Sequence, residues 1–351
     1  MSQSTTIPAI VFQSANTIEV GAFPRPSCAP GTLLCRTHYS TVSPGTELRT
    51  LRGEQEGAVF PLIPGYAWVG EVEEVASDVS GFAPGDWVCG RASTPLEGVG
   101  ATWGGHAAVH ATPTTGYAAA VKLPPGVDPL HYALVEVGAI AWRAVSMCVP
   151  APGETAVVCG QGIIGALATL WLIRAGVRVI ALDLDATRLE RAQRMGAWAV
   201  DGNAPDATAQ VLAYAGGPVD IAVEASSSHA GARLVASLLR WPHAFNGAIS
   251  YRPDEGPRLA NYWPRLCLLA SYTKTMDLLP TGLANVEGAL VFYPRDRRVS
   301  DRQAVIDQIR SGALKTADFV GAPVPYTQAS EVYRTLRDEP AKALTHVFSW
   351  E

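Results

Sequence analysis

The chain has 351 residues, of which 48% are hydrophobic and 17% are charged, and its formal net charge at pH 7 is -5. This length exceeds that of a usual single domain, so we expect two domains, and the hydrophobic fraction is ample for both cores. The charge gives no basic footprint for nucleic acid. No apolar run approaches the ~20 residues of a membrane span, and no signal-peptide pattern opens the chain, so we expect a cytoplasmic protein without a membrane partner.

Residues 1–150 alternate short apolar runs with proline and glycine. Runs of this kind, separated by turn residues, are typical of the strands of a small β-barrel-like domain. The pattern predicts strands at 9–12, 18–20, 32–39, 67–75, 86–89 and 106–110, a helix at 129–147, and a break at 150–153.

The next stretch predicts a strand, a glycine turn, a helix and a second strand. A short apolar run leads directly into Gly-Gln-Gly-Ile-Ile-Gly at 160–165. In such a turn Gly160 permits the tight bend, Gly162 lets the backbone approach a pyrophosphate, and Gly165 lets the helix pack closely. A glycine-rich turn without a ligand is the alternative, but the order of the elements favours a dinucleotide site. We expect the strands at 155–159 and 177–182 and the helix at 163–175.

Asp183 follows the second strand, 18 residues after Gly165. A carboxylate at this position binds the two hydroxyls of the adenosine ribose and repels a 2′-phosphate, so NAD(H) is favoured over NADP(H). Arg188 is expected either against the adenine ring or as a solvated helix arginine. The expected cofactor-binding residues are Gly160, Gln161, Gly162, Ile163, Ile164, Gly165, Asp183, Arg188, Glu224 and Ala225.

Strands continue to alternate with helices up to about residue 290, which predicts a doubly wound parallel sheet with ligands at the carboxyl ends of its strands. After residue 290 the pattern changes to a C-terminal return. The further strands are expected at 197–200, 219–223, 247–251 and 266–270, followed by helices at 301–310 and 328–337, an extended run at 322–324 and a closing strand at 343–350. The expected domains are 1–150, 151–289 and 290–351.

This organisation resembles the medium-chain dehydrogenase/reductase superfamily over essentially the whole chain. The resemblance implies an α/β fold in which a GroES-like β-barrel catalytic domain, completed by residues 290–351, accompanies a Rossmann NAD-binding domain. The segment at 136–138 is similar to the Glu-Pro segment of the polyol dehydrogenases. The segments that carry the resemblance are Ser43-Pro44-Gly45-Thr46-Glu47, where members have Cys-Gly-Ser/Thr-Asp, Pro64-Gly65-Tyr66-Ala67, where they have Gly-His-Glu, 70–72, 81–88 and Glu136-Val137-Gly138.

The departures from the family pattern concern zinc. Where zinc-binding members carry a cysteine, a histidine and a neighbouring carboxylate, this chain has Pro44, Tyr66 and Ala67, and of the set only Glu136 remains. A catalytic zinc needs three protein ligands, so we predict no catalytic metal. Cys89 stands alone where members carry a four-cysteine structural-zinc loop. His106 and His110 have the spacing of two helical ligands but lie in a strand-like stretch, so metal binding by them is not expected.

Without zinc, another group must stabilise the charge on the substrate oxygen or transfer its proton. Four candidates are Thr46 as a hydrogen-bond donor, Tyr66 as a general acid or base, Glu136 as a base, and His38 as part of a relay. Their structural alternatives are a bond of Thr46 to its own turn, packing for Tyr66, an interdomain salt bridge for Glu136 and a satisfied structural histidine at position 38. Some aromatic residues line a pocket or belong to the core: Trp103, Trp142, Tyr251 and Tyr272.

The resemblance therefore implies a zinc-independent, NAD(H)-dependent oxidoreductase that acts on a polyol, sugar-like or cyclic secondary alcohol or on the matching ketone. One alternative is a zinc-free double-bond reductase of the enoyl or quinone type, against which Asp183 argues because those enzymes commonly use NADPH. A second is a catalytically inactive nucleotide-binding protein. The expected partners are a small-molecule alcohol or carbonyl substrate and, by analogy, a second copy of the chain in a homodimer.

Overall fold

The computed structural model describes residues 5–91, 95–239, 263–272, 290–294 and 298–351. The chain divides into two compact units, of which unit 1 is Met1–Ala139 with Arg297–Glu351 and unit 2 is Ile140–Asp296. The first division falls inside helix α2 (Val135–Met147). The strand expected at 247–251 and Tyr251 lie outside the described residues.

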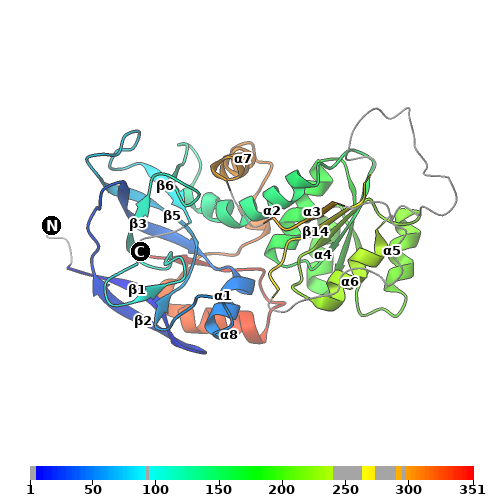
Figure 1. The fold of residues 1–351 in the computed structure, drawn as a ribbon, viewed down its shortest axis with the longest axis horizontal. Coiled ribbons are helices and arrows are strands. Elements are labelled where there is room, and N and C mark those ends of the chain that lie inside the picture. Colours follow the sequence, from blue (N-terminus) through cyan, green and yellow to red (C-terminus); the bar gives the residue numbers. More distant parts are fainter. Residues whose placement is uncertain (1–4, 92–94, 240–262, 273–289, 295–297) are drawn as a thin grey trace. The chain divides into compact units, whose positions relative to one another are not determined.

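Unit 1 contains two β-sheets and has the expected barrel-like character (Figure 1). In the larger sheet, β17 from the C-terminal segment pairs antiparallel with β3, so the end of the chain completes the sheet that the N-terminal part begins. The larger sheet has the order β16 (Val324–Pro325), β17 (Val347–Ser349), β3 (Thr32–Thr41), β5 (Ala67–Val75), β6 (Trp87–Gly90) and β9 (Val121–Lys122), and β8 (Val109–Pro113) also pairs with β3; the smaller has β2 (Thr17–Pro24), β1 (Thr6–Ser14), β4 (Leu62–Ile63) and β7 (Gly100–Ala101).

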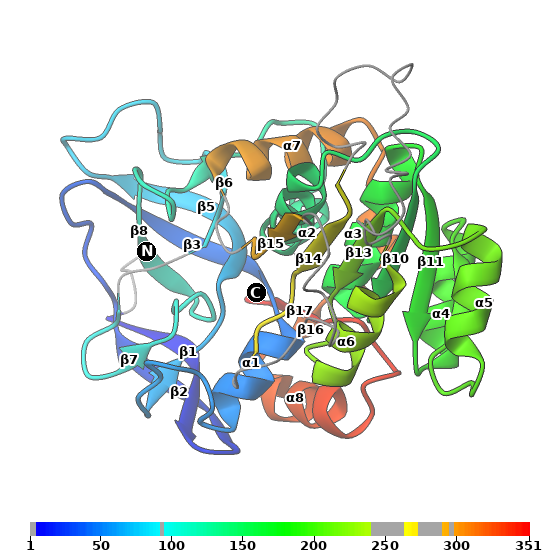
Figure 2. The same cartoon turned by 45° about the vertical axis from the view of Figure 1, so that its right-hand side comes forward.

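Two helices of unit 1, α1 (Pro44–Leu51) and α8 (Ala329–Asp338), lie side by side in both views of the ribbon (Figure 2). The sequence predicted only a turn at 43–47. The helix begins there because Pro44 occupies its first position, where a missing N–H costs nothing. The strand expected at 106–110 begins only at Val109. The other helical elements of unit 1 are η1 (Pro129–Leu134), α7 (Val299–Arg310), η5 (Thr316–Asp318) and η6 (Tyr326–Gln328).

Unit 2 is a parallel sheet bordered by helices, as the sequence predicted for a Rossmann domain (Figure 1). Its strand order places the first strand next to the fourth, which creates the switch point where such sheets bind ligands. The sheet has the order β12 (Trp198–Asp201), β11 (Arg178–Asp183), β10 (Thr155–Cys159), β13 (Ile221–Glu224), β14 (Arg265–Leu268) and β15 (Leu290–Phe292), and its helices are α3 (Ile163–Arg174), α4 (Ala186–Arg194), α5 (Ala207–Ala215) and α6 (His229–Leu238).

The core of unit 2 explains why its strands could be found in the sequence. Val157, Ile180, Ala222 and Leu266, one from each of four neighbouring strands, are fully or almost fully buried. Strands buried on both faces read as short continuous apolar runs, which is the pattern that predicted them. Among the described residues, no helix is long and apolar enough to cross a membrane.

Candidate cofactor and catalytic sites

The glycine turn between β10 and α3 has the geometry that its motif predicts. Gly160 has a φ of 89°, and a β-carbon on it would lie 2.6 Å from the backbone nitrogen of Ser226. A β-carbon on Gly165 would lie 1.8 Å from the carbonyl oxygen of Gly160, so no side chain fits there. Gly162, by contrast, has no atom within 4 Å of its β-carbon position, and its side of the turn is open. Helix α3 begins at Ile163 with no side-chain cap, which leaves N–H groups directed at this open side.

Asp183, at the end of β11, holds the turn in place. One carboxylate oxygen of Asp183 accepts a hydrogen bond of 2.5 Å from the backbone N–H of Gln161, and the other accepts bonds from Leu184 and Asp185. The side chain of Gln161 points inward, where it donates to the Val158 carbonyl oxygen. Gln161 therefore supports the turn from within, a role that the motif did not predict.

Arg188 lies beside the same carboxylate. Its guanidinium is 3.8 Å from Asp183, and its backbone N–H is bonded to Asp185, the N-cap residue of α4. Leu184, between the two aspartates, is 69% exposed. An acidic group, a basic group and an exposed apolar side chain thus adjoin the turn on its β11 side, a combination suited to a ribose and a purine ring.

A second polar cluster lies at the carboxyl end of β13. Glu224 is fully buried, and its carboxylate accepts hydrogen bonds from the Ser226 N–H at 2.7 Å, from the Ser226 hydroxyl and from the phenol of Tyr272. Burial and the bond to Glu224 raise the pKa of Tyr272. The ring of His229 is 5.9 Å from that of Tyr272, and Ala225 bonds through its N–H to the Cys159 carbonyl oxygen. The sequence pointed to Glu224 and Ala225 as cofactor contacts but gave Tyr272 no catalytic role.

In unit 1, Tyr66 is buried, with 3% of its surface exposed. Its phenol donates a hydrogen bond of 2.7 Å to the Ser43 hydroxyl, and its ring packs edge-on against Trp103. Ser43 is the N-cap residue of α1, yet its hydroxyl makes no cap bond with that helix. The sequence did not identify Ser43 as a partner of Tyr66, because the two are far apart in the chain.

The helix α1 is held instead through Glu47, the centre of a buried network. Its carboxylate accepts a 2.7 Å bond from the backbone N–H of Ser43, lies 2.9 Å from Nε2 of His106, and accepts a bond from the phenol of Tyr333 on α8. The other ring nitrogen of His106 is 2.8 Å from the hydroxyl of Ser40. His106 is therefore a buried structural partner, and three distant segments meet at one carboxylate.

Glu136 lies in a buried ion pair. From the sequence, an ion pair was only the structural alternative to a catalytic role for Glu136, and it was expected between the two domains. Its carboxylate is 3.1 Å from the guanidinium of Arg302 on α7, which also donates to the carbonyl oxygens of Tyr117 and Ala119. Glu136 and Arg302 are 1% and 0% exposed, and both belong to unit 1. The arrangement favours a structural role for Glu136, because its charge is used by a buried arginine.

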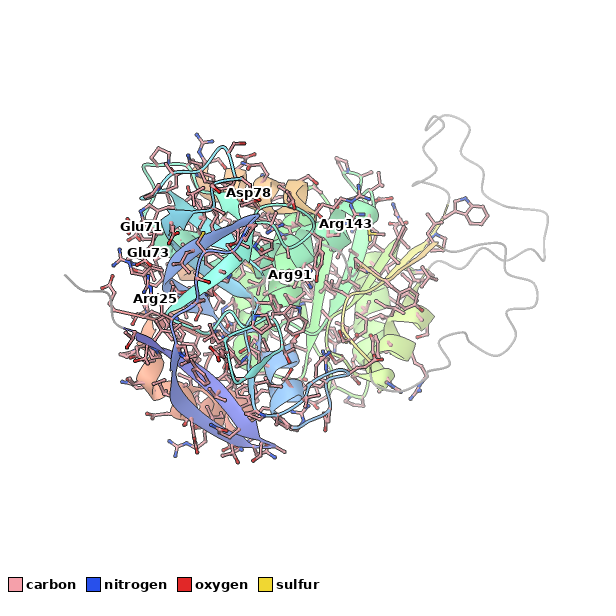
Figure 3. The ribbon with its side chains drawn as sticks, turned by 60° about the vertical axis from the view of Figure 1, so that its left-hand side comes forward. Arg25, Glu71, Glu73, Asp78, Arg91 and Arg143 are labelled. Atoms are coloured by element: carbon pink, nitrogen blue, oxygen red, sulfur yellow. The ribbon has the colours of Figure 1, made fainter. Side chains whose placement is uncertain are left out.

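The remaining two candidates are more accessible. Thr46 lies in the first turn of α1 and is partly exposed. His38 packs on the ring of Trp87, with Nε2 at 3.7 Å from Glu71. Glu71 and Glu73 also pair with arginines on this surface, and Figure 3 shows Arg25 beside the two glutamates. His38 therefore belongs to a surface of ion pairs, where its neighbours are Trp87, Glu71 and Glu351.

Over the described ranges, no group of three or more histidine, cysteine, aspartate or glutamate residues could hold a metal ion. The six cysteines are free thiols, and burial raises the pKa values of Cys35 and Cys89 above the ordinary range, so these two are protonated at neutral pH.

Comparisons with known proteins agree with this architecture. The family model of the alcohol dehydrogenase GroES-like domain matches residues 29–125. The (R,R)-butanediol dehydrogenase of Bacillus subtilis (strain 168) is 30% identical over 184 residues, which cover 47% of this chain and 51% of that protein. The chain spans between 51% and 71% of the length of the first four curated relatives that it matches.

Two solved structures cover nearly the whole chain. A short chain alcohol dehydrogenase of E. coli CFT073 in complex with NADH has a TM-score of 0.81 at 17% identity and covers 99% of this chain and 100% of that one. A dehydrogenase of Sinorhizobium meliloti 1021 bound to NADP has a TM-score of 0.81 at 20% identity, with the same coverage. These similarities establish the fold and leave the preference between the two cofactors open.

Proposed function

Because this chain belongs to the medium-chain dehydrogenase/reductase superfamily, we propose that it is an oxidoreductase that transfers a hydride between NAD(H) and a secondary alcohol or ketone. The observation that carries the proposal is the pairing of Asp183 with the open glycine turn. The turn offers N–H groups to a pyrophosphate, and Asp183 offers its carboxylate to the adenosine ribose. When bound, the nicotinamide accepts or returns the hydride.

The cofactor preference follows from charge. A 2′-phosphate beside Asp183 would be repelled by the carboxylate, and Arg188 is already close to that carboxylate. Replacing Asp183 with Ser removes the repulsion and a charged hydrogen-bond acceptor. We expect the affinity for NADH to fall about tenfold to a hundredfold and the affinity for NADPH to rise, because a charged hydrogen bond contributes about 1.5–3 kcal/mol.

We also propose that the reaction needs no zinc. Pro44, Tyr66 and Ala67 stand at positions where zinc-binding members carry ligands, and Glu136 is engaged by Arg302. In place of the metal, Thr46 and the Tyr66 phenol are the proposed hydrogen-bond groups for the substrate oxygen. His38 is not part of this proposal, because its contacts lie on the ion-pair surface.

The substrate class is proposed from the resemblance to polyol dehydrogenases and from the butanediol dehydrogenase among the relatives. The test measures NADH absorbance with (R,R)-2,3-butanediol, sorbitol, myo-inositol and 1-phenylethanol, each with NAD and NADP, before and after exhaustive chelation. Turnover with NAD that survives chelation supports the proposal. Activity that disappears with the chelator and returns with zinc refutes zinc independence, and reduction of enones but not ketones favours a double-bond reductase.

The proposal includes a homodimer, as expected for the family. The candidate surface is the edge strand β15, where Leu290 and Val291 are each 40% exposed and the adjacent Tyr293 is 55% exposed. Light scattering of the wild type and of the Leu290→Lys variant measures their oligomeric states. A monomeric wild type contradicts the proposed homodimer.

A further inference from the structure

Oxidation of an alcohol releases a proton as well as a hydride, and three of the four sequence candidates, Tyr66, Glu136 and Thr46, offer no free base to take it, while His38 lies on the ion-pair surface beside Glu71. The Tyr66 phenol is bonded to a serine hydroxyl, and the Glu136 carboxylate is held by Arg302. Thr46 has no ionisable side chain. A hydroxyl can pass on a proton only if an acceptor stands behind it. The inference below rests on the proposed function and names the residues that complete it.

Unit 2 has such an acceptor at its sheet, on the opposite half from Asp183. Sheets of this order bind a dinucleotide across the switch point, one mononucleotide on each half. Asp183 ends β11 and marks the adenosine half, which is formed by β10, β11 and β12. Glu224 ends β13, and Tyr272 follows β14 by four residues, so both lie on the half formed by β13, β14 and β15, which remains for the nicotinamide.

The burial and the hydrogen bonds of Glu224 and Tyr272 suit proton transfer. Glu224 is fully buried, while Tyr272 is only partly buried, so of the two residues Tyr272 is the one with surface open to a ligand. All three groups bonded to the carboxylate are donors, namely the Ser226 N–H, the Ser226 hydroxyl and the Tyr272 phenol, which is the arrangement that an ionised carboxylate requires.

The electrostatics determine which way the proton moves. Burial and the neighbouring Glu224 raise the pKa of Tyr272 well above its ordinary value, so this phenol keeps its proton at neutral pH. A protonated phenol whose hydrogen is bonded to a carboxylate cannot act as a base alone. It can accept a proton on its oxygen while it gives its own to the carboxylate.

We propose that Tyr272 and Glu224 form the proton relay of the hydride transfer. As the alcohol carbon loses its hydride to the nicotinamide, the alcohol proton moves to the phenol oxygen of Tyr272. The phenol proton moves to Glu224, and the alcohol becomes a carbonyl. Glu224 then releases this proton to water through the exposed Ser226 hydroxyl, to which it is bonded, before the next turnover. In the direction of ketone reduction each bond forms and breaks in reverse, and Glu224 then recovers its proton from water.

The test compares Tyr272→Phe and Glu224→Gln with the wild type, using NAD and whichever alcohol of the panel named above turns over fastest. Loss of general acid–base transfer lowers kcat about a hundredfold or more. The Kd for NADH, measured by fluorescence, stays within about threefold, because neither change removes a group from the glycine turn. The double variant is no slower than the single ones, because the two residues act in series. Tyr214→Phe, on α5 of the same unit, is the matched control and keeps the wild-type kcat.

The outcomes separate this inference from the proposed function. No turnover by the wild type with any member of the panel overturns the proposed function and the relay with it. Wild-type turnover with an unchanged kcat in Tyr272→Phe overturns the relay alone. A loss confined to NADH affinity, with kcat retained, also overturns it, because that is the result expected if Tyr272 and Glu224 only shape the loop at Ser226.

Discussion

The glycine turn of unit 2 and the Glu47 network of unit 1 both position polar groups at a site, but they do so in different ways. In the turn, Gly160, Gly165 and Asp183 lie within one strand–helix–strand segment, and their roles concern the backbone. In the network, Glu47 is held by His106 and by Tyr333, which come from distant parts of the chain. A site made from consecutive elements is set by local geometry, whereas a site made from distant segments is set by the packing of the whole unit.

The difference predicts that the two units fail differently when one residue is changed. In unit 1 a substitution leaves a buried partner without its bond, so stability is lost first. In unit 2 a substitution at the turn alters the approach of a ligand, so affinity can be lost while the fold persists. Three experiments examine this contrast, beginning with the largest expected effect.

The largest effect is expected for Glu136→Gln. It leaves the guanidinium of Arg302, which is 0% exposed, without its carboxylate. Breaking a buried pair on one side costs about 3–5 kcal/mol of unfolding free energy. We expect a loss of this size in urea unfolding, with an unchanged Kd for NADH, because the pair lies in unit 1.

The matched control is the double variant Glu136→Leu with Arg302→Met, which removes both charges. Replacing both members of a buried pair by apolar residues of similar size is often neutral. The double variant therefore recovers part of the loss, and the rest remains because the carbonyl oxygens of Tyr117 and Ala119 lose the bonds that Arg302 donates. If Glu136→Gln keeps its stability but loses kcat, then Glu136 is the base that its sequence position first indicated, and the structural reading of the ion pair is wrong.

These residues also show where prediction from the sequence reaches its limit. The strands of unit 2 were found because strands buried on both faces leave apolar runs, and Asp183 was found because its distance from the turn is fixed by one helix. The sequence predicts a turn rather than a helix at Pro44, because the eight residues of α1 span too few helical turns for their periodicity to be recognised. Arg302, Ser43 and Tyr272 were missed as partners, because only the folded sheets bring them to Glu136, Tyr66 and Glu224.

The second experiment tests the turn itself with two alanine substitutions three residues apart. In Gly165→Ala the new β-carbon would lie 1.8 Å from the Gly160 carbonyl oxygen, so the strand and helix must separate. Overpacking of this kind costs about 1–3 kcal/mol. We expect unit 2 to lose stability by that amount and to bind NADH poorly.

Gly162→Ala is its control, because no atom lies within 4 Å of the added carbon and the residue has a φ of -64°. The folded state tolerates this change, so thermal unfolding matches the wild type. Affinity for NADH falls all the same, because the added methyl group occupies the side from which a pyrophosphate approaches. Wild-type affinity in Gly162→Ala means that the dinucleotide does not dock on this turn.

The third effect is expected from acid; it is gradual rather than abrupt, and it concerns unit 1. His110 on β8 is fully buried with its ring edge-on to Trp68, and desolvation lowers its pKa from 6.5 to about 3. Below pH 6.5 the unfolded chain binds a proton at this residue that the folded chain does not, so stability is complete above pH 6.5 and is lost as the pH falls toward 3. The limiting slope for one such group is about 1.4 kcal/mol per pH unit.

Urea unfolding between pH 7 and pH 4 measures this slope for the wild type and for His110→Phe. The absolute stability of the variant depends on how the larger ring packs against Trp68, but the slope depends only on protons bound, so the comparison survives a change in packing. We expect the pH dependence of the unfolding free energy to be smaller in the variant by about 1.4 kcal/mol per pH unit, the contribution of one proton. A smaller slope remains from His346, whose pKa is also lowered by burial although its side chain is only partly buried. An unchanged slope in His110→Phe means that other groups make unit 1 sensitive to acid, and that position 110 tolerates a proton despite its burial.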